Sequence, residues 1–290
     1  MIPFPAGGSR PALGLAQLSL GGTAPPDLVR LAADAGFDFI GARVRPVTAA
    51  ERAYEMQPGS PLFAETLARM RDTGVTVRDI EFLLLDGSEQ REAWLRMMEA
   101  GAALGATGLT VAASDPDRSR LAENLARMAA DGRDHGITPM LEPISYQAVH
   151  SIPDAAELAR AAGCRIVVDT LHFRRFGGTL DELREHADLV PLLQICDGPA
   201  VRPADRDGLV TESRSERGVP GLGGFRIEEI VAALPAGVPV SVETPSDATV
   251  ARVGEAAWVR TLRDAAERVL EAADALRAST PDHHTTEPTR

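Results

Sequence analysis

Residues 238–243 (VPVSVE) form a short apolar run that ends in a carboxylate, and three similar runs come before it in the chain. These are residues 137–142 (ITPMLE), 165–169 (RIVVD) and 189–194 (LVPLLQ). Short apolar runs flanked by helix-like segments are typical of strands buried in a parallel sheet. A polar group at the end of a buried strand is costly unless it is paired or binds a ligand. Four such ends in succession indicate that they converge on one point.

The rest of the chain repeats the same strand-then-helix pattern. Eight units can be counted, and their strands start about 32 residues apart between Ala12 and Val238. A (β/α)8 barrel typically has about 250 residues over eight units. The pattern therefore predicts an α/β protein with a single (β/α)8 TIM barrel over residues 1–276. The polar residues 277–290 are expected to be a disordered tail, and residues 197–225 a long loop.

Composition excludes several functional classes. The formal net charge of −12 argues against a nucleic-acid partner. All 30 basic residues are arginine, so lysine Schiff-base chemistry and a P-loop lysine are excluded. No 18-residue apolar run occurs, so no membrane span is expected. The two cysteines, Cys164 and Cys196, are too few for a disulfide framework, which predicts a cytoplasmic protein.

The four strand ends carry Glu142, Asp169, Gln194 and Glu243. In (β/α)8 barrels the active site lies at the C-terminal ends of the strands. Three carboxylates and one carboxamide offer only oxygen ligands, which suit Mn²⁺ or Mg²⁺ better than Zn²⁺. An octahedral ion held by four protein ligands keeps two positions open, which a substrate with adjacent carbonyl and hydroxyl oxygens could fill.

Simpler explanations exist for each residue taken alone. Either glutamate could form a salt bridge with arginine at the rim of the barrel, and Gln194 could hydrogen-bond to the backbone. His172 could be an ordinary loop histidine. Glu81, in the third strand, could face the interior or pair with an arginine. Arg43 could hold an anion or be a solvated loop residue.

Five short motifs resemble those of the sugar phosphate isomerase/epimerase superfamily, the xylose isomerase-like barrels. They are residues 141–143 (LEP), 168–172 (VDTLH), 193–197 (LQICD), 217–223 (RGVPGLG) and 242–245 (VETP). The resemblance implies that the metal ligands are Glu142, Asp169, Gln194 and Glu243. It also implies that Glu142 and Glu243 are catalytic, as proton donor and acceptor, and that His172 and Arg217 bind substrate.

Two departures leave the reaction open. Many ketose epimerases of this superfamily have histidine in place of Gln194 and a further glutamate in place of Ala148. Glutamine in the third ligand position resembles the inosose dehydratase branch. The leading expectation is a metal-dependent isomerase or epimerase of a sugar or related polyol that works through an enediolate. The alternatives are a dehydratase of a keto-polyol and a non-catalytic binding barrel. A homo-oligomer remains possible.

Overall fold

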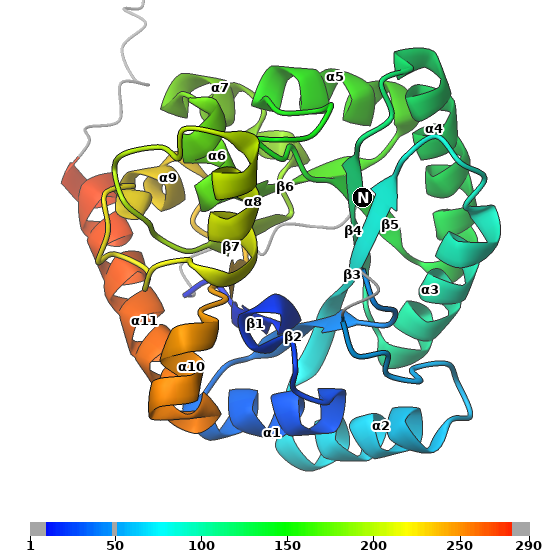
Figure 1. Cartoon of the computed structure of the whole chain (residues 1–290), viewed down its shortest axis with the longest axis horizontal. Coiled ribbons are helices and arrows are strands. Elements are labelled where there is room, and N and C mark those ends of the chain that lie inside the picture. Colours follow the sequence, from blue (N-terminus) through cyan, green and yellow to red (C-terminus); the bar gives the residue numbers. More distant parts are fainter. Residues whose placement is uncertain (1–9, 48–50, 280–290) are drawn as a thin grey trace, which may run out of the picture.

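The computed structural model describes residues 10–47 and 51–279, and its eight strands close into a parallel barrel in chain order (Figure 1). The strands are β1 (Leu13–Ala16), β2 (Phe39–Arg43), β3 (Thr76–Leu85), β4 (Gly108–Ala113), β5 (Thr138–Leu141), β6 (Arg165–Asp169), β7 (Leu192–Ile195) and β8 (Val240–Val242). β8 pairs in parallel with β1, with Leu13 opposite Val240, so the sheet has no free edge. The predicted single (β/α)8 TIM barrel is confirmed.

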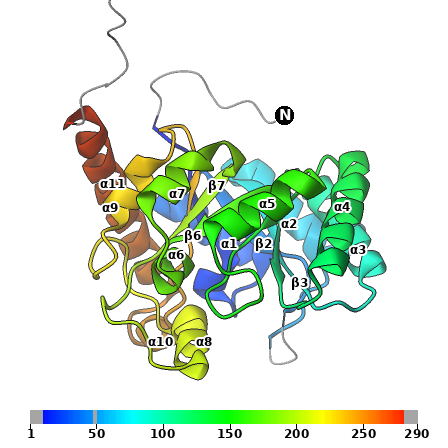
Figure 2. The same ribbon diagram turned by 90° about the horizontal axis from the view of Figure 1, so that it is seen from above.

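Helices surround the barrel, as the second view shows (Figure 2). They are α1 (Pro25–Ala35), α2 (Pro61–Thr73), α3 (Arg91–Leu104), α4 (Arg118–His135), α5 (Ile152–Ala162), α6 (Thr170–Phe176), α7 (Leu180–Glu185), α8 (Arg206–Ser215), α9 (Ile227–Ala233), α10 (Asp247–Val253) and α11 (Glu255–Ser279), with short 3-10 turns η1 (Gln17–Leu20) and η2 (Ala187–Leu189). None of the helices in the described part of the chain combines the length and apolar character that crossing a membrane requires.

Local signals set the helix ends. The side chain of Ser60 accepts a hydrogen bond from the backbone of Phe63 at the start of α2, and Pro61 occupies the first helical position. Gly74 ends the same helix with a φ of 78°, a conformation that glycine adopts without strain. Thr179 and Glu182 form a reciprocal capping box at α7.

Three segments differ from the sequence-based expectations. The predicted loop of residues 197–225 contains α8, which the buried ion pair between Arg175 and Glu212 ties to α6. The apolar run from Ala12 to Leu20, which predicts one first strand, divides into the short strand β1 and the 3-10 turn η1. The last helix extends to Ser279, three residues beyond the predicted end of the barrel, while residues 280–290 of the predicted tail lie outside the described residues.

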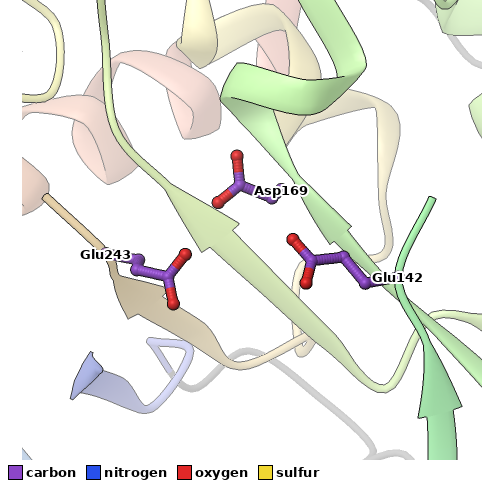
Figure 3. Close-up of side chains that lie close together, drawn as sticks. All are labelled: Glu142, Asp169 and Glu243. Carbon is purple, nitrogen blue, oxygen red and sulfur yellow. The ribbon is translucent and has the colours of Figure 1, made fainter. Parts of the chain in front are cut away.

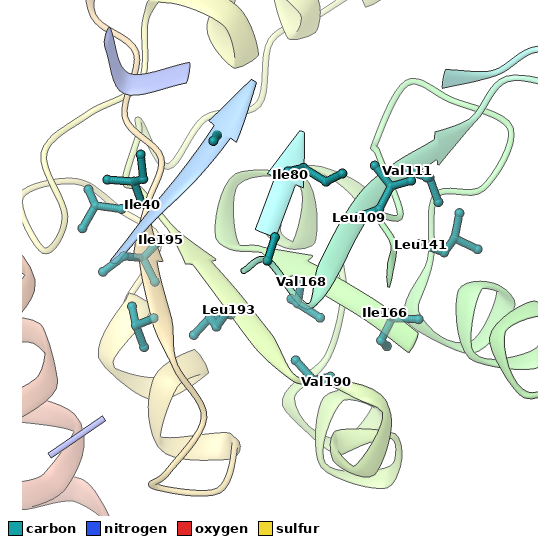
Figure 4. Close-up of a cluster of buried hydrophobic side chains, with 14 of the residues drawn as sticks. Ile40, Ile80, Leu109, Val111, Leu141, Ile166, Val168, Val190, Leu193 and Ile195 are labelled. Atoms are coloured by element: carbon teal, nitrogen blue, oxygen red, sulfur yellow. The ribbon is translucent and has the colours of Figure 1, made fainter. Parts of the chain in front are cut away.

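Inside the barrel, an apolar layer lies toward the N-terminal ends of the strands, and polar side chains lie toward their C-terminal ends. Phe39, Met140, Val167 and Leu192 form a buried cluster inside the barrel. Because side chains on a strand alternate between its faces, the residues two positions after the last three of these also point inward. They are Glu142, Asp169 and Gln194. The intervening residues, such as Ile166, Val168 and Leu193, belong to the large core cluster outside the sheet (Figure 4).

Candidate metal centre

The four predicted ligand residues meet at the C-terminal end of the barrel. Asp169 and Gln194 lie opposite each other in the pairing of β6 and β7, and Gln194 lies opposite Ser241 of β8. Glu142 and Glu243 follow the last residues of β5 and β8, and each backbone amide continues the pairing with the neighbouring strand. One oxygen from each of the three carboxylates lies within 4.8 Å of the others (Figure 3). The predicted convergence is therefore present in the fold.

Gln194 joins the cluster through its side chain. Its Nε2 donates a hydrogen bond to Oε1 of Glu243 at 3.1 Å. Its Oε1 is buried and has no hydrogen-bond partner. A buried amide oxygen without a partner is unfavourable, because it has lost its hydration without replacement. This atom is available to a further ligand.

Arg217 lies against the same carboxylates. Its Nη1 donates to Oδ2 of Asp169 at 2.5 Å and lies 3.0 Å from Oε2 of Glu243. Its Nε donates to the carbonyl of Ser213 at 2.8 Å, whereas Nη2 has no hydrogen-bond partner among the described residues. The sequence predicts that Arg217 binds substrate, and in the structure only part of its guanidinium remains free to contact a substrate.

Burial and charge set the protonation of the acids. Burial, followed by the charges of Glu243 and Asp169, raises the pKa of Glu142 well above its usual value. Burial also raises the pKa of Glu243 to about 8, although Arg217 opposes the shift. Burial acts in the same direction on Asp169, but Arg217 and then His172 hold the pKa of that carboxyl below its usual range. Without a bound cation, the cluster therefore keeps Asp169 ionised, leaves Glu243 largely protonated at neutral pH and favours the protonated form of Glu142.

His172 lies on α6, and its side chain lies beside that of Glu142. Its Nε2 is 3.8 Å from Oε1 of Glu142, and its Nδ1 is 3.2 Å from Oγ of Ser145. The ring of Tyr146 meets it edge-on, with 5.5 Å between centroids. Burial lowers the pKa of His172 to about 4, so the imidazole is neutral near pH 7. One ring nitrogen then carries a proton and can donate a hydrogen bond, and the other nitrogen can accept a hydrogen bond.

The donor set fits a hard divalent cation. All four groups offer oxygen, Gln194 has an orphaned oxygen, and the carboxylate of Glu142 accepts no hydrogen bond from any described residue. Buried carboxylates this close together repel each other unless protons or a cation neutralise them. A divalent ion would neutralise the repulsion between the carboxylates and would give the amide oxygen of Gln194 a partner.

The acidic residues of β3 have no clear role from the sequence alone. Glu81 is buried in the barrel, and its Oε2 lies 3.7 Å from Nε of Arg43, whose Nη1 pairs with Glu51 at 2.6 Å. Arg43 is therefore an ion-paired residue. Asp79, for which the sequence indicated no role, is also buried, and neither of its carboxylate oxygens has a partner in the described part of the chain. Its spacing of two from Glu81 was the available signal, since such residues share a strand face.

A cavity of about 690 Å³ opens above this cluster. Its lining includes Glu142, His172, Gln194, Arg217 and Glu243. The catalytic and substrate-binding candidates from the sequence thus share one cavity.

Three solved structures illustrate the likeness of the fold. A zinc-bound IolI protein is 14% identical, with a TM-score of 0.73 over 90% of this chain and 98% of that one. A D-allulose 3-epimerase from Methylomonas sp. is 15% identical (TM-score 0.66, 92% and 100% covered). The probable 3-DHS dehydratase AsbF from Bacillus anthracis is 13% identical (TM-score 0.69, 88% and 98% covered).

Comparison with curated protein sequences gave no match. The family model described as xylose isomerase-like TIM barrel matches residues 29–278, most of the chain. Together with the closed eight-stranded barrel and the acidic cluster at its C-terminal end, this match shows that the chain belongs to the xylose isomerase-like TIM barrel family.

Proposed function

We propose that this protein is a divalent-metal-dependent isomerase or epimerase that acts on a polyhydroxylated carbonyl compound. One observation carries the proposal. Glu142 and Glu243 line one cavity from different strands and have oxygens within 4.8 Å of each other. Two carboxylates that face one cavity can take a proton from a bound substrate and return one to it.

The proposed ligands are Glu142, Asp169, Gln194 and Glu243, and the proposed cation is Mn²⁺ or Mg²⁺. Both ions prefer oxygen ligands, and Mg²⁺ in particular is seldom held by nitrogen or sulfur. When bound, the cation would polarise the substrate carbonyl and acidify the neighbouring C–H bond.

The protein's own groups then have separate roles. One of the two glutamates removes the proton next to the carbonyl, which leaves an enediolate, and either glutamate returns it. Return to the opposite face of the same carbon inverts that centre, whereas return to the adjacent carbon moves the carbonyl. The free Nη2 of Arg217 and the neutral ring of His172 would hold substrate oxygens during these transfers.

Dehydration is the second candidate, and Ala148 favours it. This residue stands where many ketose epimerases of the superfamily have a further glutamate, and here it is exposed and outside the cavity lining. Gln194, in the third ligand position, also favours dehydration. In a dehydratase the enediolate would expel a hydroxyl group, and the glutamate that took the proton from the carbon would pass it to the leaving oxygen, so that water is released.

Product analysis in D₂O separates these reactions. The Mn²⁺-loaded protein is incubated with a panel of ketoses and keto-inositols, and the products are analysed by mass spectrometry. Deuterium next to the carbonyl in an otherwise unchanged formula indicates isomerisation or epimerisation, and loss of a water mass indicates dehydration. Failure to bind any divalent ion, with no thermal stabilisation by Mn²⁺ or Mg²⁺, would instead support the non-catalytic barrel.

A further inference from the structure

The outer wall of the cavity carries three arginines that lack an acidic partner. Arg45 is half-buried, while Arg52 and Arg214 are exposed, and all three line the cavity. Among the residues that the structure describes, none of the three forms an ion pair or donates a hydrogen bond; Arg52 only covers the ring of Tyr54, 5.2 Å from its centroid. The deeper arginines differ, because Arg43 pairs with Glu51 and Arg217 with Asp169.

Arg45 is the most informative of the three. A half-buried guanidinium has lost part of its hydration, and this loss is normally offset by an acceptor. Arg263, which is also largely buried, has Glu267 and the carbonyl of Gly36. Arg45 has no such acceptor among residues 10–47 and 51–279, although its fork of N–H donors matches the geometry of a carboxylate or phosphate.

Charge is therefore divided along the cavity. Carboxylates gather at its base, around Glu142 and Glu243, and the unpaired guanidinium groups stand on its outer wall. Three acids also line the outer wall, namely Glu51, Asp86 and Asp247; Glu51 pairs with Arg43, and Asp86 accepts hydrogen bonds from Ser88. The unpaired guanidinium groups would attract an anionic group to the outer wall, so the division favours one orientation of a charged substrate.

We propose that the substrate is a polyhydroxylated compound with one anionic group, a carboxylate or a phosphate, which binds Arg45 and Arg214. Its carbonyl and hydroxyl oxygens then reach Glu142 and Glu243 at the base of the cavity. This inference rests on the proposed function of that base and adds the class of substrate. The two arginines come from different segments, one after β2 and the other at the end of α8, and both line the same cavity.

Two matched pairs of probes test the inference by calorimetry on the Mn²⁺-loaded protein. The first pair is quinate and its uncharged methyl ester, and the second is fructose 6-phosphate and fructose. We expect the charged member of one pair to bind at least tenfold more tightly than its neutral partner. The pair that shows this difference distinguishes a carboxylate from a phosphate. Higher ionic strength should reduce the difference, because part of the attraction is between exposed charges.

Variants locate the effect. The double variant Arg45→Gln/Arg214→Gln should lose at least tenfold in affinity for the charged probe and keep its affinity for the neutral one. Arg71→Gln is the matched control, since Arg71 is exposed on α2 and outside the cavity lining. Failure of both charged probes to bind better than their neutral partners would overturn the inference. So would a double variant that behaves like the control.

The same titrations separate this inference from the proposed function. Mn²⁺-dependent binding of the neutral probes, without any preference for charge, refutes the anion site and leaves the metal-dependent polyol enzyme standing. Absence of Mn²⁺ binding in the wild-type protein refutes the proposed function and this inference with it.

Discussion

Replacing Gln194 by leucine should change the metal-free protein little and weaken metal binding greatly. The side chain has two polar ends with opposite energetic effects. Its Nε2 donates to Glu243, whereas its Oε1 is buried without a partner. A hydrogen bond between neutral groups contributes about 0.5–1.5 kcal/mol, and a buried unpaired group costs about 1–3 kcal/mol. Leucine removes both, so we expect the free energy of unfolding to stay within about 1 kcal/mol of wild type.

Metal binding has no such compensation. Leucine offers no oxygen to the cation, and we expect the affinity for Mn²⁺ to fall at least tenfold. Each tenfold loss lowers the stabilisation given by a fixed excess of the ion by about 1.4 kcal/mol. For a domain of this size, that amounts to a decrease of about 2–4 °C in the Mn²⁺-induced rise of Tm.

Calorimetric titration with Mn²⁺ and thermal unfolding with and without the ion measure both quantities. Ser241→Ala is the control, because Ser241 lies opposite Gln194 in the sheet and its hydroxyl is also buried without a partner. Ser241 is not a proposed ligand, so this variant should keep its affinity for Mn²⁺. Unchanged Mn²⁺ affinity in Gln194→Leu would refute the assignment of Gln194 as a ligand.

Three further predictions concern the charges around this cluster. Glu243→Gln should reduce turnover by about 10²–10⁴-fold, the usual contribution of a general acid or base, with little change in Tm; full activity would rule out a proton-transfer role. Arg217→Met leaves buried carboxylates without their cation and should lower the free energy of unfolding by about 3–5 kcal/mol in urea denaturation, and an unchanged midpoint would contradict this. In the metal-free protein, burial raises the pKa of Asp79 and Glu81 to about 7 and that of Glu243 to about 8, so the folded state holds protons that the unfolded chain has released. Its stability should therefore fall as pH rises through 7 and 8, and urea denaturation across this range that showed a rise would disprove the assignment.

The fold was predictable because its signals are local and repeated. Strands buried on both faces require apolar runs, and the helices between them begin and end at residues such as Ser60 and Gly74. The helix α8 was missed because residues 206–215 (RDGLVTESRS) contain little apolar sequence. Its stability depends on distant contacts, above all the buried pair of Glu212 with Arg175 of α6. No pattern within the helix itself reveals that contact.

The sequence by itself determined that a parallel barrel forms and that four oxygen-bearing side chains stand at the ends of its last four strands. The repeated strand-then-helix units predicted the barrel, and the polar residue at the end of each apolar run marked the cluster. Only the tertiary structure decided which charges pair. Arg217 pairs with Asp169 and Glu243, and Glu81 pairs with Arg43, whereas Arg45 has no acidic partner among the described residues. These pairings depend on how loops from separate strands approach one another, and no repeating pattern in the sequence records such contacts between remote segments.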